Sequence, residues 1–309
     1  MASVTTAARA DNVLHGVLLM MFGLLILSSI DGAVKFLSEF FSPLTVSFFR
    51  FAVQLLIVMA IALFHKRSWR SLLQETTLLL FCRGLLLALG SVFSVFGLKY
   101  LSLTDAAAIF FFHPVILVVL SGVFLKEKVG RLRWLAVLVG FVGVLVIMQP
   151  GTEVFQPASL LLLAAAFTFA CFLMLTRKIS GETSQLTIQF ATGFAGALLI
   201  LPIIVYAWLT GFGGDLIVAG QKASFTLPTV LLCCLGCAGL IAHVLLVKAL
   251  EKAPASVLAP INYVEIIYST TIGYLIFNEI PNDFVWYGVG LLVCSGLILA
   301  HTERRPAAS

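Results

Sequence analysis

The sequence predicts an all-α polytopic membrane protein whose ten transmembrane helices form two inverted five-helix repeats. Hydrophobic residues make up 61% of the chain and charged residues only 11%, whereas a soluble protein carries about a quarter charged residues. Each crossing of the hydrocarbon core takes roughly 20 apolar residues of helix, and short polar loops separate stretches of about that length. The predicted spans are residues 13–37, 44–64, 78–98, 104–125, 132–149, 158–176, 184–209, 228–248, 255–277 and 284–301.

The distribution of charge predicts the orientation of these helices. With the N-terminus in the cytoplasm, fourteen of the 19 Lys and Arg residues fall in cytoplasmic segments or at the adjoining helix ends. The opposite side holds only Lys222 and, at a helix end, Lys99. The positive-inside rule therefore places both tails, residues 1–12 and 302–309, in the cytoplasm. Topology accounts for the net charge of +5, so the sequence predicts no nucleic-acid partner.

All six cysteines fall inside apolar spans. Cys234 and Cys237 form a CxxC pair, a spacing that is typical of redox or metal sites. No second CxxC accompanies this pair, and it does not lie in a loop. Small packing residues on a membrane helix are the better interpretation, and the sequence predicts neither a metal site nor a cofactor.

The two halves of the chain repeat one another in sequence. Residues 44–48, LTVSF, match residues 186–190, LTIQF, at an offset of 142. Glu127 matches Glu279 at an offset of 152. The offset grows in small steps along the chain, as loop insertions would produce.

Each predicted domain, residues 13–149 and residues 158–301, contains five of the predicted crossings. Because five is odd, the second half enters the membrane from the opposite side, and the repeat is inverted. Inverted repeats are typical of secondary transporters, whose substrate site lies near the bilayer midplane between the repeats. The chain has no long Gly-rich phosphate loop, so we do not expect direct use of ATP.

Glu265 is the first candidate for a functional residue, because a carboxylate near the middle of a membrane helix is costly and usually faces the bundle interior. It either binds substrate or a proton, or pairs with a basic side chain of another helix. His113 occupies the equivalent position of the first half, at the offset of 152, and Pro114 follows it. We expect either a proton relay or a substrate grip shared with Glu265, or a hydrogen-bonded histidine beside a proline kink.

Four further charged side chains within the predicted spans are candidates for function. Asp31 and Lys35 are four residues apart, so they share a helix face and form either a structural pair or part of a cavity wall. Arg50 and Arg83 lie about two turns into the second and third spans. Each guanidinium is suited to a carboxylate or phosphate, but for Arg83 we favour a side chain that extends to the membrane interface.

Asn262, Tyr263 and Tyr268 flank Glu265, and on one continuous helix Asn262, Glu265 and Tyr268 share a face. Such a polar, aromatic stripe suits a ligand with a flat ring and hydrogen-bonding groups. The predicted substrate-binding residues are Glu265, His113, Asn262, Tyr263, Tyr268, Asp31 and Arg50.

Short motifs accompany this arrangement of helices: Phe-Arg-Phe at 49–51, Pro-Val at 114–115 and Leu-Lys-Glu at 125–127. Together with the repeat, they resemble the drug/metabolite transporter superfamily and its EamA-type domains over essentially the whole chain. Asp31 with Lys35, Arg83-Gly84-Leu85-Leu86 and Tyr263-Val264-Glu265 are similar to the S-adenosylmethionine uptake carriers of that superfamily. Those carriers tend to have a basic residue where this chain has Asn262.

The sequence and the resemblance together imply a secondary transporter in the bacterial inner membrane that moves a small organic metabolite by alternating access. We expect import of a vitamin or cofactor-like compound, with riboflavin ahead of S-adenosylmethionine, because an aromatic stripe with few charges suits a neutral, flat ligand. Export of amino acids or toxic compounds is the alternative within transport. A membrane-embedded enzyme would need a motif such as DDxxD or GxSxG, and neither occurs. Small residues such as Gly143 and Gly288 permit close packing, either within one subunit or in a homodimer.

Overall fold

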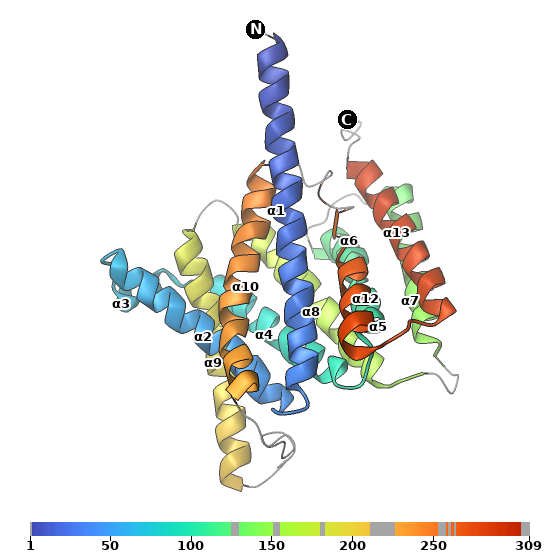
Figure 1. Ribbon diagram of the computed structural model, residues 1–309. Helices are drawn as coiled ribbons and strands as arrows, with labels where there is room; N and C mark the ends of the chain where they lie inside the picture. The colour runs from blue at the N-terminus through green and yellow to red at the C-terminus, as the bar shows by residue number, and fades with distance from the viewer. Residues whose placement is uncertain are drawn as a thin grey trace. The chain divides into compact units, whose positions relative to one another are not determined.

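The computed structural model describes residues 2–124, 130–150, 155–179, 183–210, 226–252, 258, 261–262 and 264–303 (Figure 1). Within these ranges every element is a helix. Eight of the described helical stretches are long and apolar enough to cross a membrane, and Val264–Phe277 and Asp283–Leu299 are shorter apolar helices. The all-α, multi-pass character of the fold is therefore confirmed, while the count of ten crossings and the repeat remain predictions.

The described residues form two compact units, and each unit draws segments from both halves of the sequence. Unit 1 comprises Met1–Asp31, Ser102–Phe155 and Ile241–Ser309. Its helices are most of α1 (Ala2–Leu37), α5 (Leu103–Phe110), α6 (His113–Phe124), α7 (Arg131–Met148), the end of α10 (Thr226–Lys252), α12 (Val264–Phe277) and α13 (Asp283–Glu303). Within this unit α7 lies along α13, and α5 packs against α12 (Figure 1).

Unit 2 comprises Gly32–Leu101 and Gln156–Leu240. Its helices are the end of α1, α2 (Pro43–Phe64), α3 (Trp69–Glu75), α4 (Leu78–Leu98), α8 (Ala158–Ile179), α9 (Gln185–Thr210) and the start of α10. Here α4 packs against both α8 and α9, and α2 packs against α9. One hydrophobic cluster of this unit is centred on the buried side chains Leu44, Phe51, Ala88 and Ile200.

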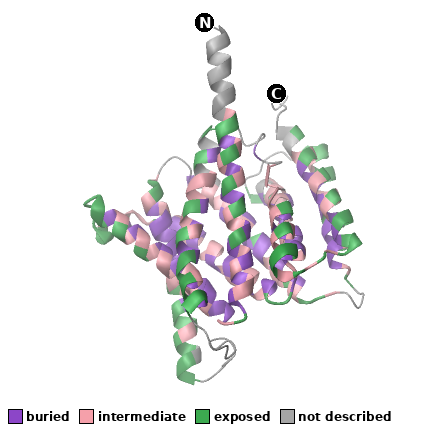
Figure 2. Ribbon diagram, in the orientation of Figure 1, coloured by how far each residue is buried: buried purple, intermediate pink, exposed green. Residues whose placement is uncertain are grey.

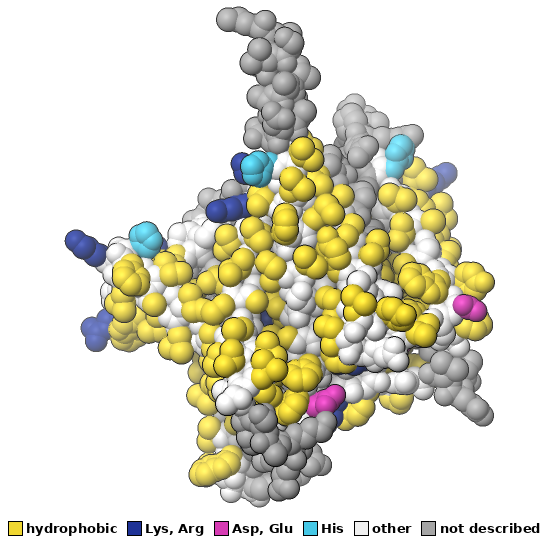
Figure 3. Space-filling view, in the orientation of Figure 1, with side chains coloured by type: hydrophobic (Ala, Val, Ile, Leu, Met, Phe, Trp, Pro, Cys, Tyr) yellow, Lys and Arg dark blue, Asp and Glu magenta, His cyan; other side chains and the backbone are white. Residues whose placement is uncertain are grey.

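The helices bury one side against their neighbours and leave apolar side chains exposed on the other (Figure 2). Leu63, Trp208 and Leu275 are each more than two thirds exposed, and hydrophobic side chains cover most of the described surface seen in Figure 3. A large continuous apolar surface marks a contact with lipid or with another protein. Together with the length of the helices, it fits a chain embedded in a bilayer.

Side-chain caps determine where several helices begin. Ser42, Thr77 and Ser102 each precede a helix, and each hydroxyl accepts a hydrogen bond from the backbone N–H three residues later. These bonds satisfy donors that the first helical turn leaves without a partner. The caps therefore start α2, α4 and α5 at defined residues.

The predicted span 104–125 is not one continuous helix. α5 ends at Phe110 and α6 begins at His113. Pro114 explains the interruption, because it has no N–H to donate to the Phe110 carbonyl four residues earlier. His113 Nδ1 lies 3.0 Å from that carbonyl oxygen, and since a carbonyl only accepts, the ring nitrogen donates. Leu103–Phe124 as a whole is one apolar stretch long enough to cross a membrane, so the predicted span agrees with the structure. Within it the backbone is divided into two short helices beside Pro114, at the predicted proline kink.

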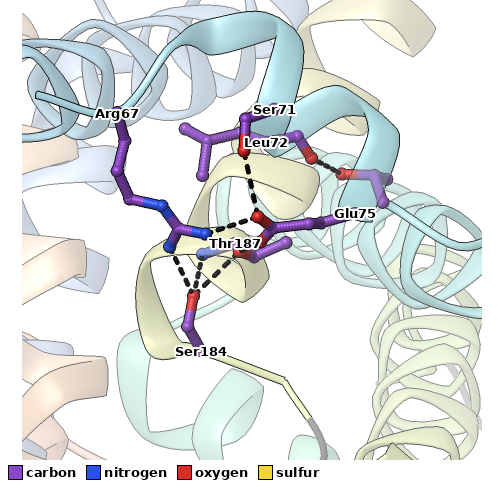
Figure 4. A network of polar contacts seen from close by, with 7 residues as sticks. Arg67, Ser71, Leu72, Glu75, Ser184 and Thr187 are labelled. Carbon is purple, nitrogen blue, oxygen red and sulfur yellow. Dashed lines mark hydrogen bonds and ion pairs between the residues drawn. The ribbon is translucent and has the colours of Figure 1, made fainter.

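The segment predicted as the loop 65–77 contains α3, which a polar network holds against the start of α9 (Figure 4). Arg67 forms an ion pair with Glu75, and it also donates to Ser184 Oγ at 3.3 Å. Ser71 Oγ donates to Glu75 Oε1 at 3.1 Å, and Thr187 Oγ1 donates to Glu75 Oε2 at 2.6 Å. These contacts connect the segment between α2 and α4 to the first turn of α9. Glu75 itself lies outside the apolar spans, and Thr187 lies at the start of the span Gln185–Thr210.

This network predicts an acid-sensitive contribution to stability. The hydrogen bond from Thr187 is the largest cause of a pKa of Glu75 below its ordinary value of 4.5. A carboxyl group with a lowered folded-state pKa stabilises the fold above its unfolded-state pKa, and this stabilisation is lost as the pH falls through the folded-state pKa. We expect the thermal unfolding midpoint to fall more steeply below pH 4.5 in the wild type than in Thr187→Val.

The control is Thr271→Val, which removes a hydroxyl that donates to the Ile267 carbonyl of its own helix. The midpoints of all three proteins would be measured in detergent between about pH 7 and about pH 3, the range in which carboxylates titrate. The Thr271→Val profile should follow the wild type. Parallel profiles for the wild type and Thr187→Val would contradict the role given to Glu75.

Candidate functional site

The structure brings two of the predicted site residues, Asp31 and Glu265, together in unit 1. Glu265 lies in the first turn of α12 and is half-buried. Asp31, on α1, is close enough for its negative charge to repel the Glu265 carboxylate. Ser28 Oγ, one turn before Asp31, donates to the Glu265 backbone carbonyl at 3.4 Å. The same pair of helices therefore positions both carboxylates.

Buried hydroxyls complete the contact between α1 and α12. Ser269, one turn after Glu265, donates from its Oγ to Ser28 Oγ at 3.4 Å. Both serines are fully buried. Neither serine was predicted from the sequence, because charged residues give the stronger signal in a membrane span. Small polar residues one turn away from an intramembrane carboxylate were the available signal.

His113 and Glu265 each lie at the start of a described helix. His113 is the first residue of α6, and Glu265 is the second residue of α12. His113 is buried, its Nδ1 bonds the Phe110 carbonyl, and its ring contacts the rings of Phe110 and Phe111. This geometry gives His113 a structural role at the break, while its contact with substrate remains a prediction.

The aromatic stripe predicted on one continuous helix is only partly described. Asn262 lies in a short 3₁₀ turn before α12 begins at Val264, so it does not continue the helix face of Glu265. Tyr263 lies outside the described residues. Tyr268 packs against the hydrophobic cluster of Met20, Leu24, Ala249 and Leu258. The continuous stripe was therefore wrong for Asn262, because the helix starts two residues too late.

Arg50 belongs to unit 2, where its NH1 group donates to Ser91 Oγ on α4 at 3.4 Å. On the next turn of α2, Gln54 Nε2 donates to Gln189 Oε1 of α9 at 2.7 Å, and both amides are buried. This pair was not predicted from the sequence. Glutamines inside apolar spans are a weaker signal than charges, since they cost less to bury.

Arg83 differs from its predicted position. The side chain does not extend to the interface: it is only 9% exposed and donates from Nε to Thr176 Oγ1 at 2.7 Å and from NH1 to Thr192 Oγ1 at 3.0 Å. Its guanidinium carbon also lies 4.2 Å from the centre of the Phe172 ring. Hydroxyls inside unit 2 replace the headgroup contacts that a long side chain near a helix end usually makes.

Lys35 donates from Nζ to the Leu101 backbone carbonyl at 2.7 Å within unit 2.

Among the described residues, no group of three or more His, Cys, Asp or Glu side chains is arranged to hold a metal ion. The polar groups that the structure does assemble are carboxylates in unit 1 and basic or amide groups in unit 2. This chemistry is suited to binding charged organic groups.

Known proteins are similar to this chain in sequence or in fold. An S-adenosylmethionine uptake transporter of Rickettsia felis is 28% identical over 278 residues, which are 90% of each chain. A riboflavin transporter of Vibrio cholerae is 29% identical over 192 residues, which cover 62% of this chain and 60% of the relative. One solved protein structure, with 15% sequence identity, covers 94% of this chain and 99% of its own with a TM-score of 0.64.

The family comparison agrees with these relatives. The profile of the EamA-like transporter family matches residues 14–149 and 156–300, so the predicted resemblance to EamA-type domains is confirmed. The family and the names of the relatives identify a transporter rather than an enzyme. This multi-pass membrane protein therefore belongs to the EamA-like transporter family.

Proposed function

We propose that the protein imports a positively charged organic metabolite across the bacterial inner membrane by alternating access, with both termini in the cytoplasm. The observation that carries this proposal is the contact between the helix of Asp31, α1, and the helix of Glu265, α12. Ser28 donates to the Glu265 carbonyl there and accepts from Ser269. Two carboxylates that repel one another inside a membrane favour a shared proton or a bound cation. A cationic substrate and a proton therefore compete for the same carboxylates.

This chemistry changes the order of the two substrates expected from the sequence. Riboflavin is neutral, whereas S-adenosylmethionine carries a sulfonium and an ammonium group. The paired carboxylates suit the cation, and the relative named for S-adenosylmethionine uptake aligns over 90% of this chain. We therefore place S-adenosylmethionine first and riboflavin second.

The alternating-access part of the proposal follows from the two predicted inverted repeats, residues 13–149 and 158–301. The first contains an apolar span that is divided between α5 and α6, and the second contains the short apolar helix α12. Transporters of inverted-repeat design place their substrate and ion sites at such discontinuous helices. Glu265 lies in the first turn of α12.

The experiment is uptake of labelled S-adenosylmethionine, and separately of labelled riboflavin, by liposomes that contain the purified protein. We expect saturable uptake of S-adenosylmethionine that an excess of the unlabelled compound abolishes, and slower uptake of riboflavin. Empty liposomes provide the background. If a folded protein transports neither compound, both substrates are excluded. If it transports only riboflavin, the cationic-substrate proposal is wrong.

A further inference from the structure

Arg83 is a buried cation whose described partners leave its charge without a counterion. It lies in α4 of unit 2, within an apolar span. Its contacts are the hydroxyls of Thr176 and Thr192 and the face of the Phe172 ring. In the described part of the chain no carboxylate forms an ion pair with it. Charges inside membranes are costly, and such residues usually serve function.

The guanidinium is held in a fixed position. The hydroxyl of Thr176 donates to the Phe172 carbonyl at 2.7 Å, and that of Thr192 donates to the Ile188 carbonyl at 2.8 Å. The oxygen of each is therefore oriented to accept from Arg83. Gly84 allows α4 to approach α9 closely here, since a Cβ at this position would lie 2.9 Å from the Ala191 carbonyl oxygen.

Two of the five N–H groups of Arg83 are used by the threonines, and the planar fork of a guanidinium matches the two oxygens of a carboxylate. We propose that Arg83, positioned by Thr176 and Thr192, forms an oxyanion subsite of unit 2 that binds the carboxylate of the transported metabolite. This proposal rests on the proposed transport of a metabolite that carries a carboxylate as well as positive charge.

A matched pair of ligands tests the subsite, because decarboxylated S-adenosylmethionine differs from S-adenosylmethionine only in lacking the carboxylate. Each is titrated against the thermal unfolding midpoint of the purified full-length protein in nanodiscs of phosphatidylcholine. A hydrogen-bonded charge pair corresponds to at least about a tenfold preference. We expect the wild type to prefer the carboxylated ligand by that factor and Arg83→Gln to bind the two ligands within about twofold.

Two further variants distinguish carboxylate binding by Arg83 from a role of Arg83 in helix packing. Thr192→Val keeps the charge but removes one positioning hydroxyl, and we expect an intermediate preference. Arg70→Gln, an exposed arginine of the same unit, should retain the wild-type preference. If Arg83→Gln unfolds at a lower temperature but still prefers the carboxylated ligand, Arg83 only connects helices and the proposal is overturned.

A second pair of ligands tests whether Arg83 binds a carboxylate, even if S-adenosylmethionine does not bind. Acetate should raise the unfolding midpoint of the wild type more than acetamide does, and Arg83→Gln should lose this difference. No difference in the wild type overturns the oxyanion subsite, whichever metabolite is transported. If only phosphatidylglycerol added to the nanodiscs stabilises the protein through Arg83, the anion is a lipid headgroup and the assignment to substrate is wrong.

Discussion

Replacing Glu265 by glutamine is expected to reduce uptake to the level of empty liposomes at every pH. Glutamine keeps the shape of the side chain but neither carries a negative charge nor exchanges a proton. A cation that loses its buried partner loses about 3–5 kcal/mol, which is more than about a hundredfold in affinity. Initial rates of S-adenosylmethionine uptake by Glu265→Gln and the wild type, at matched amounts of protein, measure the effect.

The same substitution should leave the fold intact, and this separates a functional role from a structural one. Glu265→Gln removes the repulsion from Asp31, so we expect an unfolding midpoint equal to or above that of the wild type. Asp283→Asn is the control, because Asp283 is an exposed acid at the start of α13 in the same unit. Unchanged uptake by Glu265→Gln would remove Glu265 from the mechanism, and a much lower midpoint would make it a structural residue.

Hydropathy alone predicts that this is a multi-pass membrane protein. The length of a membrane span is set by the thickness of the bilayer, so predicting it requires no knowledge of the tertiary structure. The start of α4 at Leu78 and the end of α2 at Phe64 were therefore predicted to the residue. A proline kink beside His113 was one of two alternatives that the sequence left open, but a complete break between α5 and α6 was harder to predict. The apolar run continues through it, and only Pro114 signals that the backbone hydrogen bonding stops there.

Sequence patterns do not predict which segments of the chain make up each of the two units. Unit 1 joins Met1–Asp31 to segments more than 70 residues further along the chain, and α1 and α10 each contribute to both units. Periodicity describes one helix at a time and contains no information on which helices pack together. The proximity of Asp31 and Glu265 was therefore not predictable from spacing, although each residue was identified as an intramembrane charge.

The positions of buried polar side chains also depend on which helices pack together. Arg83 was expected at the interface because long basic side chains reach water when nothing closer binds them. Thr176 and Thr192, about a hundred residues away along the chain, provide that closer partner. Threonines are common in apolar helices, so their contact with Arg83 becomes visible only once α4, α8 and α9 are packed together.

The close packing of α7 and α13 in unit 1 leads to the second large expected effect, on stability. Gly143 and Gly288 face one another, and a Cβ added to Gly288 would meet the side chain of Ile147 and lie 2.7 Å from the Gly143 carbonyl oxygen. Close helix contacts in membranes depend on such small residues. Gly288→Ala must therefore push the two helices apart, and we expect a loss of about 1–3 kcal/mol in stability.

Gly290 provides the matched control two residues further along α13, since a Cβ added there meets no atom within 4 Å. Gly290→Ala should leave the unfolding midpoint unchanged or raise it slightly, because alanine favours helix more than glycine does. Thermal unfolding of both variants in the same detergent makes the comparison. Because α7 directly contacts α13, we expect a lower unfolding midpoint for Gly288→Ala and not for Gly290→Ala. Equal unfolding midpoints for the two variants would show that these helices separate without loss of stability.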